Sequence, residues 1–385
     1  MRLFSFLILF VVLSNSALAQ WETEVSNTTA NLRGINTVGG GVAWASGAQG
    51  TILRTTNGGK TWKHCSIPPK AENLDFAGIQ AFDENTAIIM STGLGDQSRI
   101  YKTNDGCLTW VLLFTNPDAP YGSFRAMQFL PGIGRDQGRV ADLIGDPVKG
   151  TFFSNNFAIF RTNDYGKTWT KNEGAWKASA RYGEVLLAAS NSSLIEIRNA
   201  PLFVTAGSHS RSRTEEEHVK DDPSVRVGYV GGNLPMQHGK SAGAASVSAH
   251  LGPDSLADSD AAKYIVRAAH AGDVLVAVGG DYQHPDNADG TCAVSTDGSL
   301  HWFASKNPPH GYRSSVAYDD NSKTWITVGP NGTDISTDDG LNWSALKPSN
   351  SEPTDVDKNW NALSLPFIVG QNGRIGRLRP DAFKH

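Results

Sequence analysis

The stretch Thr55-Thr56-Asn57-Gly58-Gly59-Lys60-Thr61-Trp62 decides the fold, because its pattern returns four more times along the 385-residue chain. In every copy a Ser or Thr is followed two places later by Asp or Asn, and five places after that by Trp. The copies span residues 55–62, 103–110, 162–169, 295–302 and 336–343. Recurrence of one figure is typical of repeat architectures, so the sequence predicts a repeat protein.

Each copy is expected to form a tight turn between two strands. The short Asp or Asn side chain can accept hydrogen bonds from backbone N–H groups just ahead of it. Glycine at the fifth position (Gly59, Gly166 and Gly340) supplies a positive φ. The Trp is expected to cover the turn with a large apolar ring. The residues given these structural roles are Asn57, Trp62, Asp105, Trp110, Asp164, Trp169, Asp297, Trp302, Asp338 and Trp343.

These copies resemble Asp boxes, also called BNR repeats, which occur in sialidases, glucan hydrolases, sortilin-type receptors and photosystem II assembly factors. The resemblance implies a turn between the third and fourth strands of a β-propeller blade. Segments such as 32–35, 43–47 and 328–332 extend the likeness over nearly all of residues 21–380. The chain there looks like exported bacterial BNR/YVTN-type or photosystem II assembly factor-like propellers, some of which are labelled oxidoreductases. Cys107 and Ser299 depart from the pattern where glycine is usual.

We predict an all-β fold, a seven-bladed β-propeller. The interval from Trp169 to Trp302 is about twice a blade and indicates one blade without its turn, with strands at 185–189, 194–197 and 202–206. The last blade, within 360–378, offers three strands, and an isolated strand stands at 21–25. Pairing that N-terminal strand with the last blade would close the ring and cover two sheet edges.

The N-terminus predicts a signal peptide over residues 1–19. Arg2 is followed by the apolar run Leu3–Leu13, and Ala17-Leu18-Ala19 is a small-x-small cleavage site. The run is too short to cross a bilayer, so no membrane span is expected after cleavage. We expect a secreted or periplasmic protein, with residues 20–385 as a single propeller domain that contains a polar insertion or irregular blade at about 207–262.

The three cysteines would then lie in a compartment where disulfides persist. Cys65 follows the first copy of the repeat and Cys107 lies inside the second, so the two would belong to neighbouring blades. A bridge between them is geometrically feasible, and two unpaired thiols are the alternative. Neither the cysteine spacing nor the scattered histidines indicate a metal site. No cofactor is expected.

Charge and motifs limit the function classes. The formal charge of −4 comes without a basic stripe, so nucleic acid is not an expected partner. Sialidase chemistry is disfavoured because Arg99-Ile100-Tyr101 lacks the proline of the arginine motif. Another glycoside hydrolase would need two facing carboxylates, for which Asp146 and Asp281 are weak candidates. The segment 132–138 does not match the dinucleotide fingerprint of oxidoreductases.

A binding function accounts for more of the residues. Aromatic side chains and arginine dominate protein interfaces. Six such residues are expected near strand starts around the propeller axis, namely Tyr121, Phe124, Arg125, Tyr282, Tyr312 and Arg313. We therefore predict a monomeric protein-binding or assembly module with a protein partner, or a glycan as the alternative. A carbohydrate-active enzyme and a propeller oxidoreductase stay as alternatives, and whether the chain is an enzyme is left open.

Overall fold

The computed structural model describes residues 20–130, 138–149, 155–172, 179–180, 186, 193–197, 200–205, 224–229, 246–250, 267–271, 274–280, 282, 284–296, 303–346, 353, 355–380 and 382–383. The predicted signal peptide lies outside the described residues. So do Asp281 of the carboxylate pair and both Asp297 and Trp302 of the fourth repeat copy.

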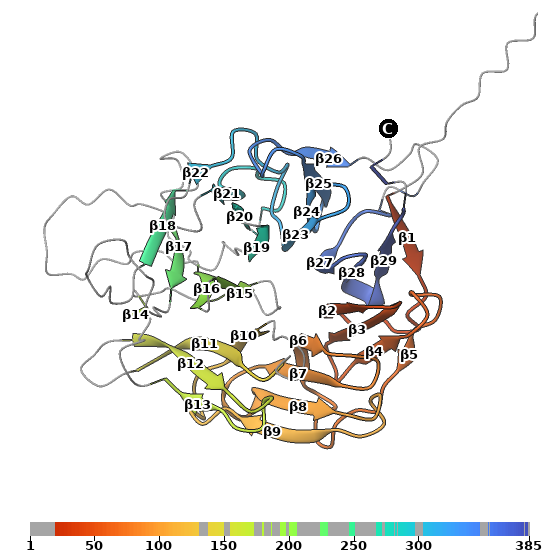
Figure 1. The fold of residues 1–385 in the computed structure, drawn as a ribbon, viewed down its shortest axis with the longest axis vertical. Helices are drawn as coiled ribbons and strands as arrows, with labels where there is room; N and C mark the ends of the chain where they lie inside the picture. The colour runs from red at the N-terminus through yellow and green to blue at the C-terminus, as the bar shows by residue number, and fades with distance from the viewer. Residues whose placement is uncertain are drawn as a thin grey trace, which may run out of the picture.

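The described chain is a ring of antiparallel sheets around a common axis (Figure 1), which confirms the all-β propeller. The first sheet contains β2 (Leu32–Gly39), β3 (Val42–Gly47), β4 (Ile52–Thr55) and β5 (Lys63–His64), and the second contains β6 (Asp75–Ala81), β7 (Ala87–Thr92), β8 (Arg99–Thr103) and β9 (Val111–Thr115). The third contains β10 (Phe124–Phe129), β11 (Ala141–Lys149), β12 (Asn155–Thr162) and β13 (Thr170–Lys171), and the short β14 (Ser179–Ala180) also pairs with β12.

The chain continues round the ring in the same manner. The fourth sheet contains β15 (Leu194–Ile197), β16 (Ala200–Thr205), β17 (Ser224–Tyr229) and β18 (Ser246–His250). The fifth contains β19 (Arg267–Ala271), β20 (Val274–Val278), β21 (Cys292–Ser295) and β22 (Phe303–Ala304). The sixth contains β23 (Ser315–Asp319), β24 (Thr324–Gly329), β25 (Gly332–Ser336) and β26 (Ser344–Leu346). In each sheet the strands follow in chain order from the axis outward (Figure 1).

The ring closes as expected from the sequence. The last sheet has the order β1 (Trp21–Glu24), β29 (Ile375–Leu378), β28 (Phe367–Gly370) and β27 (Trp360–Ser364). Trp21 lies opposite Leu378, and Glu24 lies opposite Ile375. The N-terminal strand therefore supplies the outermost strand of the last blade, and the prediction of this closure is confirmed.

The apolar core lies between neighbouring blades. Second strands are mostly buried, and β24 is buried along its whole length, because a sheet in a propeller is covered on both faces. The outermost β5 is exposed at both of its residues. Six clusters of buried apolar side chains are described, and each joins two sheets that are adjacent in the ring.

The predicted number of blades, seven, is corrected to six. The sheet of β15 to β18 enters the described packing through Leu194 and Phe203, which together with Leu186 contact the sheet of β10 to β13. Its outer strands β17 and β18 are described as a ladder of backbone pairs alone, so this sheet is not counted as a complete blade. This sheet comes from the part of the chain without a repeat turn, and β17 and β18 fall inside the polar range 207–262. Its innermost strand is β15, whereas the sequence placed that strand at 185–189.

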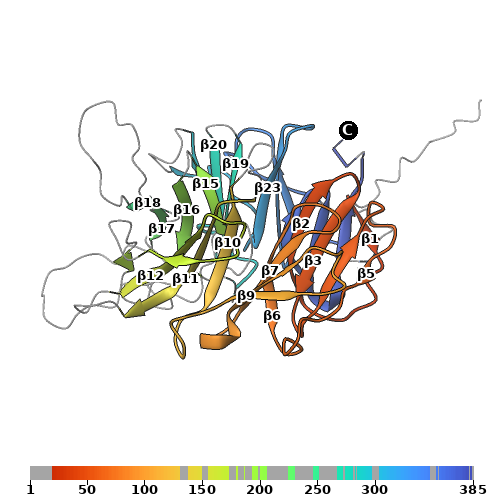
Figure 2. The same ribbon diagram turned by 60° about the horizontal axis from the view of Figure 1, so that its bottom comes forward.

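The ring has two distinct faces (Figure 2). We call the side on which the innermost strands begin the leading face; it is formed by loops 25–31, 93–98, 116–123, 306–314 and 355–359. The repeat turns lie on the opposite, trailing face. There Gly58 N–H donates to Gly41 O at 2.8 Å, and Gly106 N–H donates to Asn85 O at 2.9 Å, so these two repeat turns are tied to the first turns of their own blades. Among the described residues, the structure contains no helix with the length and apolarity needed to cross a membrane.

Candidate binding face

The innermost strands share a β-bulge where they leave the leading face. In four of them the register shifts directly after a large buried residue (Leu32, Phe76, Phe124 or Trp360). A bulge re-aims the side chain of the extra residue and is common next to functional sites. The four extra residues are Arg33, Ala77, Arg125 and Asn361. Polar side chains thus occupy equivalent positions at the start of three innermost strands.

Both bulge arginines are half-buried and paired with carboxylates. Arg125 donates from Nε and Nη2 to the two oxygens of Asp146, at 2.8 and 2.7 Å. Arg33 pairs with Asp75 of the next innermost strand. The forked pairing of Arg125 with Asp146 fixes that guanidinium in one orientation. Asp146, predicted as half of a hydrolytic pair, therefore has both oxygens engaged by Arg125, which was predicted as a binding residue.

An exposed apolar patch lies beside Arg125 on the leading face. It consists of Leu94, Pro120 and Tyr121, with Tyr121 73% exposed and Leu94 66% exposed. The two loops that carry it are held together, because Gly95 N–H donates to Gly122 O at 2.9 Å. A side chain at Gly95 would meet the backbone of Pro120 at 3.1 Å, so the loops are in close contact. The patch is therefore a fixed surface rather than two independent loops.

Charged pairs surround this patch. Asp96 pairs with Arg99 at 3.5 Å, Asp118 pairs with Lys171, and Arg125 pairs with Asp146 on the side of the axis. Each of these three carboxylates is paired with a cation, so the charges of these six side chains balance. Exposed apolar residues within a polar rim are typical of interaction sites. Of these residues, Tyr121 and Arg125 were predicted from the sequence as binding residues. Leu94 was not predicted, because a single leucine in a polar loop does not by itself indicate a binding site.

Two predicted binding residues are part of the core. Phe124 is buried between blades and stacks on Phe114 with ring centres 5.7 Å apart. Tyr312 is also buried. Tyr282 is 40% exposed and remains accessible at the surface. Phe124 begins β10, and Tyr312 lies just before β23, whereas Tyr282 lies between β20 and β21 rather than at the start of an innermost strand. A buried and an exposed aromatic residue look alike in sequence.

Arg313 is fully buried at the seam between the blade of β23 to β26 and the closing blade. It donates from Nε to Asp334 Oδ2 at 2.7 Å and from Nη2 to the same carboxylate. Its Nη1 donates to Tyr312 O at 2.8 Å and to Asn331 Oδ1 at 2.5 Å. The guanidinium nitrogens of Arg313 thus bond to groups of the protein itself. Burial raises the pKa of Asp334, but hydrogen bonding to His310 and the Arg313 charge outweigh it and hold that pKa below its ordinary value.

Asp357 is a buried carboxylate at this seam that the sequence analysis missed. Its oxygens accept hydrogen bonds from Thr333 N–H at 2.9 Å, Thr333 Oγ1 at 2.6 Å and Trp360 Nε1 at 2.9 Å. Burial raises its pKa to about 6, against these hydrogen bonds and the charge of Arg313. The same Thr333 Oγ1 accepts a hydrogen bond from Trp21 Nε1 at 2.9 Å. Asp357 is therefore connected to the N-terminal strand.

The four described repeat turns share one hydrogen-bond pattern. In the second, Thr103 Oγ1 donates to Asp105 Oδ1 at 2.8 Å and accepts from Cys107 N–H at 3.1 Å. Asp105 Oδ1 also accepts from Leu108 N–H and from Thr109 N–H, both at 3.0 Å. Hydrogen bonds from Thr109 to its carboxylate lower the pKa of Asp105 to about 2. The turn aspartates thus stabilise the backbone of their own turns.

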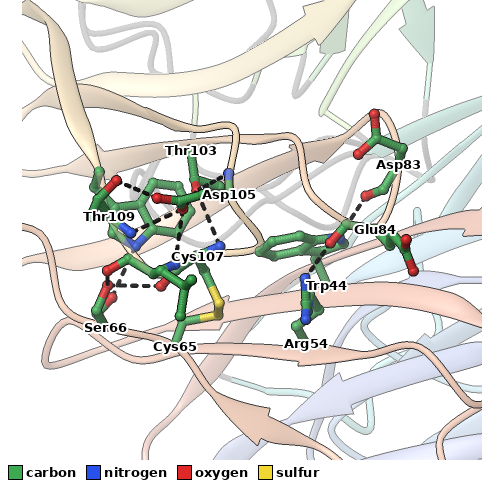
Figure 3. The surroundings of a disulfide bond; sticks show 12 residues. Trp44, Arg54, Cys65, Ser66, Asp83, Glu84, Thr103, Asp105, Cys107 and Thr109 are labelled. Carbon is green, nitrogen blue, oxygen red and sulfur yellow. Dashed lines mark hydrogen bonds between the residues drawn. A yellow bond between two sulfur atoms is a disulfide. The ribbon is translucent and has the colours of Figure 1, made fainter.

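Cys65 and Cys107 are joined by a disulfide between the first two blades (Figure 3). Their Cα atoms are 5.3 Å apart. Ser66 next to Cys65 adds hydrogen bonds to the same turn, from its Oγ to Cys107 O at 2.8 Å and to Leu108 O at 2.9 Å. The third cysteine, Cys292, is free and buried, and burial raises the pKa of its thiol to about 12.

Comparison with known proteins gives likenesses of fold. No protein-family model matches the chain, and no curated protein matches it in sequence. The chain is similar to the structure described as YCF48 bound to D1 peptide, with 18% identity, TM-score 0.58 and coverage of 94% of this chain and 97% of that one. YCF48 from Cyanidioschyzon merolae is 14% identical, with TM-score 0.54 and coverage of 94% of this chain and 100% of that chain.

A xyloglucanase of family GH74 from Xanthomonas campestris is 14% identical, with TM-score 0.54 over 95% of this chain. This chain spans 54% of the xyloglucanase. A binding protein and a hydrolase thus share the architecture, which carries no single activity. These likenesses and the ring of sheets identify the chain as a β-propeller.

Proposed function

We propose that the chain is an exported propeller module that binds a segment of another protein on its leading face. The observation that carries the proposal is the exposed patch of Leu94, Pro120 and Tyr121, fixed by the contact of two loops beside the Arg125–Asp146 pair. Large apolar side chains at a rigid surface supply contact area at low entropic cost. The neutral rim suits a partner segment with an apolar side chain at its centre rather than a highly charged one.

The likeness to YCF48 bound to D1 peptide supports this proposal, since it is a propeller of the same architecture in complex with a peptide. The repeat turns, which resemble Asp boxes, and the likeness of the whole chain to photosystem II assembly factor-like proteins are consistent with a binding or assembly role.

Export is part of the proposal. Residues 1–19 resemble a signal peptide, and the Cys65–Cys107 disulfide is of a kind that persists in oxidising compartments. Cleavage after Ala19 would leave Gln20 and the whole of β1 in the mature chain. N-terminal sequencing of the protein from the exported fraction of its host should begin at Gln20. Recovery of intact Met1 from the cytoplasm alone would contradict this part.

Site-specific photocrosslinking tests the binding face. A photoreactive phenylalanine analogue replaces Tyr121 in one variant and Leu108 in another. Leu108 is a suitable control because it is 65% exposed but lies in a repeat turn on the trailing face. After illumination in the host, we expect a discrete protein adduct from position 121 and none from position 108. The identified partner is then purified and titrated against the unmodified protein.

Two substitutions complete the test. Tyr121→Ser and Leu94→Ser should each weaken binding of the identified partner, by about ten-fold or more if these residues anchor it, whereas Leu108→Ser should not. Equal adducts from positions 121 and 108, or unchanged affinity of the Tyr121→Ser variant, would refute the leading face as the binding site. Adducts with glycans in place of protein would support the alternative partner class. Hydrolysis is not part of the proposal, because Asp146 is engaged by Arg125.

A further inference from the structure

The seam that closes the ring contains two buried carboxylates and one buried guanidinium. Asp334 and Asp357 are each at most 5% exposed, and Arg313 is fully buried. Arg313 directs both Nε and Nη2 to Asp334. Asp357 receives hydrogen bonds from neutral donors, Thr333 and Trp360. No described residue places a cation within ion-pair distance of Asp357, so its negative charge would be the one without a direct partner.

The hydroxyl of Thr333 links this carboxylate to the N-terminal strand. Trp21 is buried, and its indole N–H donates to Thr333 Oγ1, which in turn donates to Asp357 Oδ1 at 2.6 Å. Trp360, at the start of β27, donates to the same oxygen. Trp21 belongs to β1 and Thr333 belongs to β25 of the preceding blade. Asp357 thus lies where the closing strand meets the blade before it.

We propose that β1 is a proton-sensitive latch, which holds the ring closed most firmly when Asp357 is protonated and more weakly when Asp357 is ionised. Removing the proton leaves an extra negative charge in a buried seam, which is costly when no cation pairs with it. Opening of β1 exposes the seam to water and relieves this cost. The latch is a property of ring closure and does not depend on the proposed binding function.

The direction of the pH dependence follows from the pKa of Asp357. Burial raises it from an ordinary value of 3.8 to about 6 in the closed ring. A raised carboxyl pKa means that the closed form binds more protons, so closure is strongest below about pH 4 and weakens as the pH rises to about 6. Between pH 4.5 and 7.5 the closing equilibrium is expected to fall about 30-fold.

Other charged groups near the seam belong to the loops and strands that pack on Asp357. Arg313 and Asp334 form the buried pair described above. His310 contacts Asp334 through Nδ1 at 2.9 Å and is the histidine of this cluster. The loop that carries Asp357 also contains Asp355 and Lys358, and Asp355 pairs with Arg374 at 2.6 Å.

Hydrogen exchange of the full mature chain tests the latch. Protection factors, corrected for the intrinsic pH dependence of exchange, are measured for amides of β1 and of β7, a central strand far from the seam in the ring (Figure 1). We expect the protection of β1 to fall by about 30-fold from pH 4.5 to 7.5 and that of β7 to stay within about three-fold. Parallel loss in both strands, or constant protection of β1, would overturn the proposal.

Two variants assign the titrating group. Asp357→Asn removes the ionisation, so the protection of β1 should become independent of pH. His310→Gln removes the histidine and should leave the pH dependence as in the unchanged protein. If Asp357→Asn does not fold, the His310→Gln variant still decides, because loss of the pH dependence there would assign the effect to His310 and refute the role of Asp357.

Discussion

Cys107 has a φ of 66° at the turn position that glycine occupies in three other repeat turns, and its sulfur is bonded to Cys65 of the neighbouring blade. Gly59, Gly166 and Gly340 have φ values of 91°, 80° and 81° at the same position. A non-glycine residue in this region of conformation is disfavoured. The second turn thus accepts an unfavourable backbone conformation at the residue that forms the covalent connection between two blades.

This relationship separates two effects of Cys107. Reduction of the disulfide should lower the free energy of unfolding by about 4 kcal/mol, the loop-closure value for cysteines 42 residues apart. Under reducing conditions, Cys107→Gly should then be about 1 kcal/mol more stable than Cys107→Ala, because glycine adopts a positive φ without penalty. Urea unfolding of the three proteins with and without reductant measures both quantities. Equal stability of the Gly and Ala variants would show that the backbone conformation carries no cost.

Trp21 should account for most of the contribution of β1 to stability. Its ring is buried against the preceding blade, and its N–H binds Thr333. Trp21→Ala is expected to lower the free energy of unfolding by about 3–5 kcal/mol through the cavity it leaves. Val25→Ala, a change at a highly exposed residue next to the strand, should cost less than about 0.5 kcal/mol. A small effect of Trp21→Ala in urea unfolding would mean that the ring does not depend on its N-terminal strand.

Two arginines that look equivalent in sequence should behave differently. Arg313→Gln leaves Asp334 buried without its cation, and we expect a loss of about 3–5 kcal/mol in the free energy of unfolding. Arg125→Gln breaks a half-exposed pair and should cost about 1 kcal/mol or less. Thermal and urea unfolding at neutral pH distinguish the two. Similar losses for both variants would contradict the different burial of the two pairs.

The repeat turns, the strands before them and the closure by β1 could be predicted because each depends on local residues. Asp, Gly and Trp at fixed spacing specify the turn, and an isolated N-terminal strand together with a last blade of only three strands indicates closure. The blade count could not be predicted in this way. β15 to β18 lack a repeat turn, and their pairing joins segments separated by long polar stretches, so register there depends on contacts that no local pattern specifies.

The binding face was predicted only in part, for a different reason. Tyr121 lies three residues before Phe124, the first residue of β10, yet Tyr121 is 73% exposed and Phe124 is buried. Which of them faces solvent is decided by packing against the next blade, where Phe114 and Phe160 enclose Phe124. Leu94 joins Tyr121 through a contact between two loops. Asp357 becomes notable only through burial, which no short sequence pattern indicates.

Acid sensitivity should depend on the turn aspartates, and Asn57 provides a natural comparison. Asn57 Oδ1 accepts from Thr61 N–H at 3.0 Å, as Asp105 does from Thr109 N–H. The pKa of Asp105 is lowered to about 2 from an ordinary 3.8, so its stabilising effect is complete above about pH 4 and is lost as the pH falls towards 2.

The Asp105→Asn variant should therefore have a lower melting temperature than the unchanged protein at pH 6, and this difference should shrink as the pH falls from 4 to 2. The reverse substitution, Asn57→Asp, should introduce the same acid sensitivity into the first turn. Melting curves from pH 2 to 6 for the three proteins provide the test. A difference between Asp105→Asn and the unchanged protein that stays constant over this range would show that the Asp105 carboxylate is no better stabilised in the folded turn than in the unfolded chain.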